Sequence, residues 1–164
     1  MARRTSFILL CAATAALAAS GLAACGGGSS SPSGGFAAKA DAVCRQTLQQ
    51  FERIQTTPPK TASQAEKQAA ALVDVSERAL GDLHDLTPPA SVQAAYDRYL
   101  AAREQALKYL KDGEAAAANR DAGAYAKAKR QAAAQQATRL QLARDAGLKG
   151  CSRPAVTFGG GGGK

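Results

Sequence analysis

The 164-residue sequence has no tryptophan, a single histidine and a single methionine, which is Met1. A di-iron site in a helical bundle uses Glu-x-x-His pairs on two helices, and one histidine cannot supply them. Haem of the c type requires Cys-x-x-Cys-His, which does not occur, and a haem with histidine and methionine ligands lacks an internal methionine. No glycine-rich phosphate loop joins a strand pattern to a helix pattern. We therefore expect neither a cofactor nor a metal.

Aromatic residues are also scarce, at 5% of the chain, whereas hydrophobic residues make up 46% and many of these are alanine. Because alanine buries little surface, the core should be thin. Its helices have to pack closely, with small residues at their contacts. No segment shows the period-two alternation of a strand, so the composition and patterning together predict an all-α protein.

Residues 1–24 have the layout of a secretory signal peptide. Arg3 and Arg4 form a positive start, and an apolar stretch rich in alanine runs from Phe7 to Ala24. A membrane-spanning helix is the alternative, but such a helix usually has charged residues on both flanks. Here glycine and serine follow instead, which favours a cleaved signal.

The stretch Leu22-Ala23-Ala24-Cys25 resembles the lipobox of bacterial lipoproteins. The resemblance implies that Cys25 receives a diacylglyceryl thioether, that the signal is cut before it, and that Cys25 becomes the first residue of the mature chain. Two acyl chains hold a protein firmly at a bilayer. We expect an exported protein on the outer leaflet of the cell membrane; the alternative is ordinary cleavage with an unmodified thiol.

If Cys25 carries lipid, the mature chain retains Cys44 and Cys151 as a pair. Outside the cytoplasm such a pair normally forms a disulfide. Free thiols or metal ligands are the alternatives, but no Cys-x-x-Cys motif and no nearby histidine supports them. We predict a Cys44–Cys151 disulfide.

The chain after Cys25 divides into a tether, a helical domain at 36–151 and a tail. The sequence GGGSSSPSGG at 26–35 predicts a flexible tether that, with Cys25, forms the segment 25–35, and we expect residues 152–164 to be disordered. Apolar residues recur at helical spacing in four segments between them. The predicted helices span residues 36–56, 62–86, 89–118 and 122–147.

Several local signals set the expected ends of these helices. Pairs of prolines, at 58–59 and 88–89, end the first two helices, and the second pair can open the third. Ser63 and Glu66 fit a capping box, and Asp121 fits an N-cap. Gly113 weakens the third helix, and a stop at that residue is an alternative.

Four helices with short connections pack most simply as an up-down-up-down bundle. That arrangement places the start of the first helix beside the end of the fourth. A bridge from Cys44 to Cys151 then closes a loop of about 100 residues and contributes up to ~4–5 kcal/mol.

The single histidine is the only candidate for catalytic or metal chemistry. Asp82 and Asp85 lie close to His84 in the sequence, but at helical spacing His84 points away from the side that they share. We expect these three residues to form a solvated helix end. An enzyme has no support in the sequence.

Positive charge is concentrated near the C-terminus. Residues 25–119 hold ten basic and eleven acidic side chains, whereas residues 120–164 hold nine and two. The pattern favours an ordinary solvated surface, with cations near the end of the helix favoured by the helix dipole. The alternative is a basic face on the last helix that contacts anionic lipid or a cell-wall polymer. The extracytoplasmic location and the absence of interleaved aromatic residues disfavour nucleic acid. The candidate contact residues are Lys127, Lys129, Arg130, Arg139, Arg144 and Lys149.

Beyond the lipobox, the whole chain resembles a group of small, disulfide-linked helical lipoproteins of high-GC Gram-positive bacteria. The resemblance rests on the tether, Ala-Asp-Ala-Val-Cys44, Leu-Thr-Pro-Pro-Ala between helices, and Gly-Leu-Lys-Gly-Cys151. It implies an architecture and no activity. The leading hypothesis is a non-enzymatic interaction or structural module of the cell envelope. The alternative is a bundle that binds a small apolar ligand, which requires a cavity of a few hundred Å³.

Overall fold

The computed structural model describes residues 32–154, which form an all-α domain without a strand in that range. The domain confirms the predicted fold class. Its helices, in chain order, are α1 (Pro32–Ile54), α2 (Ala62–His84), α3 (Gln93–Ala118), α4 (Ala122–Ala134) and α5 (Gln136–Asp145).

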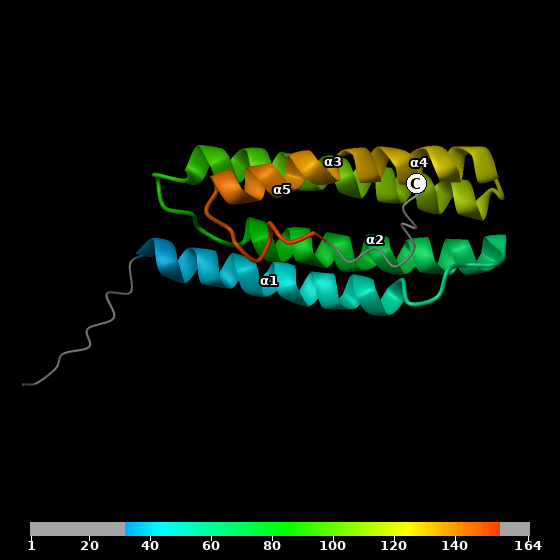
Figure 1. Cartoon of the computed structure of the whole chain (residues 1–164), viewed down its shortest axis with the longest axis horizontal. Helices are drawn as coiled ribbons and strands as arrows, with labels where there is room; N and C mark the ends of the chain where they lie inside the picture. Colours follow the sequence, from blue (N-terminus) through cyan, green and yellow to red (C-terminus); the bar gives the residue numbers. More distant parts are fainter. Residues whose placement is uncertain (1–31, 155–164) are drawn as a thin grey trace, which may run out of the picture.

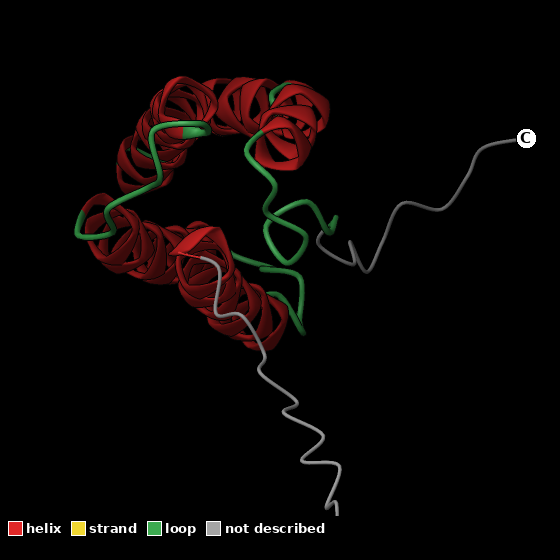
Figure 2. Cartoon of the chain, turned by 90° about the vertical axis from the view of Figure 1, so that its left-hand side faces the viewer, coloured by secondary structure: helices red, strands yellow, loops and turns green. Residues whose placement is uncertain are grey.

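The helices lie side by side along the long axis of the molecule (Figure 1). Helix α1 packs on α2, α2 packs on α3, and α3 packs on both α4 and α5. The described part of α1 makes no direct helix contact with α4 or α5. Viewed from the end, the helices therefore follow a curve, and the segment after α5 lies between its two arms (Figure 2). This C-terminal segment, residues 146–154, is what connects α5 to α1.

Helix α1 begins earlier than the sequence predicts. It starts at Pro32, so residues 32–35 of the predicted tether form its first turn. Proline is accepted at the first helical position because its missing N–H has no partner there in any case. The rest of the tether and Cys25 lie outside the described residues. At the other end, α1 stops at Ile54, close to the predicted boundary.

The N-cap of α2 is Thr61, not the predicted Ser63. The Thr61 side chain accepts a hydrogen bond from the Gln64 backbone N–H at 3.2 Å. Gln64 Oε1 in turn accepts from the Lys60 N–H at 2.8 Å. Thr61 and Gln64 stand at the spacing of a capping box and fit one as well as Ser63 and Glu66 do, so the motif was predicted two residues too late.

Helix α3 begins later than predicted, at Gln93, and continues through Gly113, where the sequence left a stop open. Pro89 does not open it; residues 89–92 form a turn in which the Val92 N–H bonds the Pro89 carbonyl at 3.0 Å. Gly113 lies inside the helix and is buried. A Cβ built on Gly113 would lie 3.6 Å from the Ala128 Cβ, so the glycine lies where α3 meets α4.

The predicted fourth helix is interrupted at Gln135 and ends at Asp145. Asp121 caps α4 as predicted, accepting from the Ala124 N–H at 2.9 Å. Gln135 has ψ −13°, away from the helical value, and separates α4 from α5. No proline or glycine marks this break in the sequence.

The end of α5 is a Schellman motif at Gly147, in the place where the sequence predicts a stop. Gly147 has φ +75°, and its N–H bonds the Arg144 carbonyl at 2.9 Å. The Leu148 N–H reaches the Ala143 carbonyl at 2.8 Å. Glycine adopts this left-handed conformation without a steric cost. The turn sends Leu148 into the core, where its side chain is fully buried.

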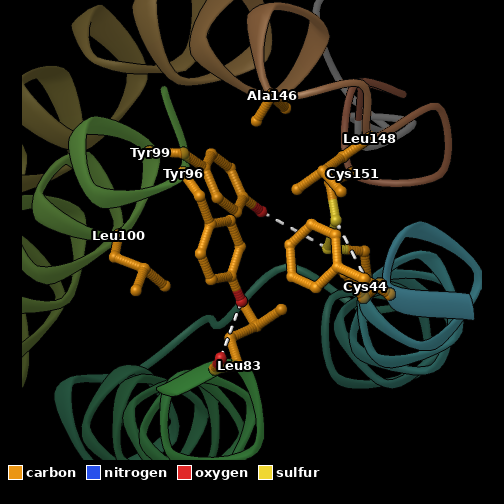
Figure 3. Close-up of a cluster of buried hydrophobic side chains, with 11 residues drawn as sticks. Cys44, Leu83, Tyr96, Tyr99, Leu100, Ala146, Leu148 and Cys151 are labelled. Atoms are coloured by element: carbon orange, nitrogen blue, oxygen red, sulfur yellow. Dashed lines mark hydrogen bonds between the residues drawn. A yellow bond between two sulfur atoms is a disulfide. The ribbon is translucent and has the colours of Figure 1, made fainter. Parts of the chain in front are cut away.

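The core is rich in alanine, as the composition predicts, but one end of it holds larger side chains (Figure 3). Tyr96, Tyr99, Leu83 and Leu148 are the largest fully buried side chains of the described domain. Elsewhere α2, α3 and α4 meet mainly through alanine and Gly113. Among the described helices, none combines the length and hydropathy needed to cross a membrane.

Candidate functional site

A disulfide joins Cys44 of α1 to Cys151 of the C-terminal segment, as predicted. The Sγ atoms are 2.03 Å apart and the Cα atoms 5.0 Å apart, and the two cysteines are separated by 107 positions in the sequence. Both cysteines are buried, at 6% and 7% exposure. The bond fixes the segment after α5 against a helix that α5 itself does not touch.

Asp41, which lies about one helical turn before Cys44 in α1, binds the same C-terminal segment. Its Oδ1 accepts hydrogen bonds from the backbone N–H groups of Gly150 at 2.7 Å and Cys151 at 3.3 Å. Hydrogen bonds to a carboxylate are stronger than those between neutral groups. A Cβ on Gly150 would lie only 2.8 Å from the Asp41 Cβ and 2.9 Å from its carbonyl oxygen. Only glycine allows this close approach.

Two buried tyrosines connect α3 to the disulfide and to α2 (Figure 3). The Tyr99 hydroxyl lies 3.3 Å from Cys44 Sγ, and because a disulfide sulfur carries no proton, the hydroxyl is the donor. The Tyr96 hydroxyl donates to the Leu83 carbonyl at 2.6 Å. Burial, and secondarily the neighbouring Tyr99, raise the pKa of Tyr96 to about 12, although Arg103 opposes the shift. Both phenols therefore serve as structural hydrogen-bond donors.

Beside the disulfide lies a groove with a volume of about 80 Å³. It is smaller than the few hundred Å³ expected for a site that encloses an apolar ligand. Five parts of the chain line it: α1, α2 through Ser76, α3, α5 and the C-terminal segment. Its arginine and large apolar lining residues are Leu48, Phe51, Arg103, Leu107, Leu110, Arg139, Leu140 and Arg153.

Three arginines from three parts of the chain line this groove. Arg103 comes from α3, Arg139 from α5 and Arg153 from the C-terminal segment. Arg103 Nη1 donates to the Tyr99 hydroxyl at 3.3 Å, and its guanidinium lies 5.9 Å from the Tyr99 ring centroid. Burial, and next the positive charge of Arg103, lower the pKa of Arg139, while Tyr99 opposes the shift. The groove thus concentrates positive charge next to the disulfide.

Arg139 therefore differs from the other five basic residues that the sequence singled out. It is partly buried in the groove, whereas Lys127, Lys129, Arg130, Arg144 and Lys149 are exposed. Residues two apart on a helix, such as Lys127 and Lys129, point in different directions. The exposed cations consequently do not form one face. Lys149 lies in the C-terminal segment that Asp41 binds, directly before Gly150.

His84 is exposed, as are Asp82 and Asp85, and it contacts a residue of α3. Its Nε2 lies 3.1 Å from Glu104 Oε1, and about half of each side chain is exposed, at 47% and 54%. Within residues 32–154, no three histidine, cysteine or acidic side chains are close enough together to hold a metal ion.

Two arginines of the groove, Arg103 and Arg153, were not among the candidate residues predicted from the sequence. Arg103 continues the inward stripe of Tyr96, Tyr99 and Ala106 at three- and four-residue steps, which was a usable signal. Arg153 had no such signal, because it lies in the predicted disordered tail. Ser152 and Arg153 instead belong to the folded segment, where Ser152 Oγ donates to the Lys149 carbonyl at 3.0 Å.

Comparison of the chain with protein-family models, with curated proteins and with solved structures found no match.

Proposed function

We propose that the chain is an exported lipoprotein, held on the outer leaflet of the cell membrane by lipid on Cys25, with a non-enzymatic interaction module as its folded part. The Cys44–Cys151 disulfide carries the proposal, because such bonds persist outside the reducing cytoplasm. It also accounts for two of the three cysteines that follow the predicted signal peptide. Cys25, in its lipobox, is the third.

The position of the fold along the chain suits a membrane-proximal module. Helix α1 begins at Pro32, seven residues after Cys25. A glycine- and serine-rich chain of that length has a root-mean-square span of about 15 Å. The disulfide and Asp41 bring the C-terminal segment, with exposed Lys149, against α1 at residues 41–44. Anionic headgroups or a cell-wall polymer are therefore proposed as contacts for this end of the domain.

We further propose an up-down-up-down course for the helices. Helices that are consecutive in the chain are also neighbours in space. The connections at residues 55–61, 85–92 and 119–121 are short, and such connections favour antiparallel neighbours. In this course α4 and α5 run in the same direction and together form the fourth helical element, interrupted only at Gln135.

The anchor is tested by intact-mass analysis of protein extracted from membranes of the producing cell. The expected mass is that of residues 25–164 without two cysteine protons, plus a diacylglyceryl group. A Cys25→Ala variant should lose the adduct and the membrane association. A matched Ser29→Ala variant, changed in the tether only, should retain both. Native protein without an adduct, or a variant that stays membrane-bound, would refute the anchor.

A further inference from the structure

The groove beside the disulfide has a charged end and an apolar end. Arg103 lies next to Tyr99, whose hydroxyl touches Cys44, and Arg153 follows Cys151 by two residues. Arg139 and Arg103 line the same groove, and the positive charge of Arg103 contributes to the lowered pKa of Arg139. Along α3, Leu110 lies seven residues beyond Arg103, about 10 Å away at 1.5 Å per residue.

The charged end lacks a negative partner within residues 32–154. The ion pairs there involve Asp74, Glu77, Glu104 and Asp112, and none of them includes an arginine of the groove. Arginine remains charged at neutral pH even when burial lowers its pKa. Like charges that face one groove repel, and an anion bound between them would remove that repulsion. Guanidinium groups match carboxylate and phosphate oxygens in geometry.

The apolar end is lined by large side chains that are only partly covered. They come from α1, α3 and α5, and each is neither fully buried nor fully exposed: Leu48, Phe51, Leu107, Leu110 and Leu140. Covering such surface contributes about 25 cal/mol per Å². A ligand with an apolar chain would gain this stabilisation, whereas a free anion would not.

We propose that this groove binds a single-chain anionic amphiphile, with its carboxylate or phosphate at Arg103, Arg139 and Arg153 and its acyl chain along the apolar end. Because the groove volume is only about 80 Å³, most of the acyl chain would lie on the partly covered apolar surface and would not be enclosed. An acidic protein partner is a poorer match, because apolar side chains continue the groove directly from the arginines. The proposal concerns the helical domain alone and does not depend on the lipid at Cys25.

The test is calorimetric titration of residues 25–164 carrying Cys25→Ser, which keeps every described residue and needs no detergent. The probes, used below their critical micelle concentrations, are dodecanoate, lauroyl lysophosphatidate and neutral monolauroylglycerol. Inorganic phosphate and hexaglutamate serve as anions without an acyl chain. We expect the two anionic amphiphiles to bind, and each of the other three probes to bind at least about tenfold more weakly. Monolauroylglycerol lacks the charge-assisted hydrogen bonds to arginine, and phosphate and hexaglutamate lack an acyl chain to cover the apolar end.

Arg139→Gln should weaken binding of the anionic amphiphiles about tenfold. Arg153→Gln should also weaken it, and because Arg153 is exposed, this change should disturb the fold less. Arg130→Gln, in the exposed part of α4, is the matched control and should bind as the parent does. Thermal unfolding of each variant verifies the fold. Equal binding of monolauroylglycerol, phosphate or hexaglutamate would overturn the proposal. So would an absence of binding, or unchanged affinity in both groove variants.

Discussion

At the scale of single residues, Gly147 and Gly150 are required for different physical reasons. Gly147 is needed for its left-handed backbone, which ends α5 and turns Leu148 into the core. Gly150 is needed for its missing side chain, because the backbone of α1 at Asp41 occupies the place of a Cβ. Both glycines shape the segment that carries Cys151 and Arg153.

Gly150→Ala should lower the free energy of unfolding by about 1–3 kcal/mol, since the new methyl group meets backbone atoms that cannot move aside alone. Gly81→Ala is the control: Gly81 is exposed inside α2, and its Cβ would have no neighbour within 4 Å. The control should gain about 0.5–1 kcal/mol, as for alanine in a helix interior. Urea unfolding measures both, and equal effects of the two substitutions would contradict the close contact at Asp41.

At the scale of elements, α3 organises the domain. It contacts α2, α4 and α5, and it contributes Tyr96, Tyr99 and Arg103 to the region around the disulfide. Its small residues, Gly113 among them, allow α4 to approach closely. An uninterrupted α3 is therefore what aligns the alanine-rich contacts at one end with the groove at the other.

Gly113→Ala tests that continuity. In a regular helix the substitution should raise the free energy of unfolding by about 1 kcal/mol, because the methyl group makes an ordinary contact with Ala128 at 3.6 Å. Chemical denaturation followed by circular dichroism measures the change. A helix that ended at Gly113 with a left-handed residue would instead be destabilised by alanine, so a loss of stability would argue against the continuous α3.

At the scale of the whole molecule, the disulfide connects the two ends of the row of helices, α1 and the segment after α5. Because α1 does not pack on α4 or α5, residues 146–154 and the Cys44–Cys151 bond provide the connection across the domain. Asp41 adds two hydrogen bonds at the same place. The stability of the domain should consequently depend on the bond more than in a closed bundle.

The double variant Cys44→Ala/Cys151→Ala should unfold with a free energy about 2–5 kcal/mol below that of the parent, because the bond closes a long loop in the unfolded chain. Reductant should bring the parent down to a similar stability and leave the double variant unchanged. Urea unfolding with and without dithiothreitol measures this. A loss below about 1 kcal/mol would mean that helix packing alone holds the two arms together.

Much of the fold could be predicted because its signals are local. Apolar residues at three- and four-residue steps indicated the helices, and the cysteine count, together with the lipobox resemblance, indicated the partner of Cys44. The errors were local too: Thr61 and Ser63 offer equivalent caps, and nothing in the sequence around Gln135 marks the break between α4 and α5.

The sequence by itself determined the helical class and the alanine-rich contacts, since both depend on residue type and spacing along one chain. The bridge from Cys44 to Cys151 followed from the cysteine count once the lipobox resemblance had assigned Cys25. Only the tertiary structure decided that Arg103, Arg139 and Arg153 line one groove. They belong to three separate parts of the chain, 50 positions apart at the extremes. Their meeting depends on the order in which helices pack and on the path of the segment after α5, which periodicity along one helix does not encode.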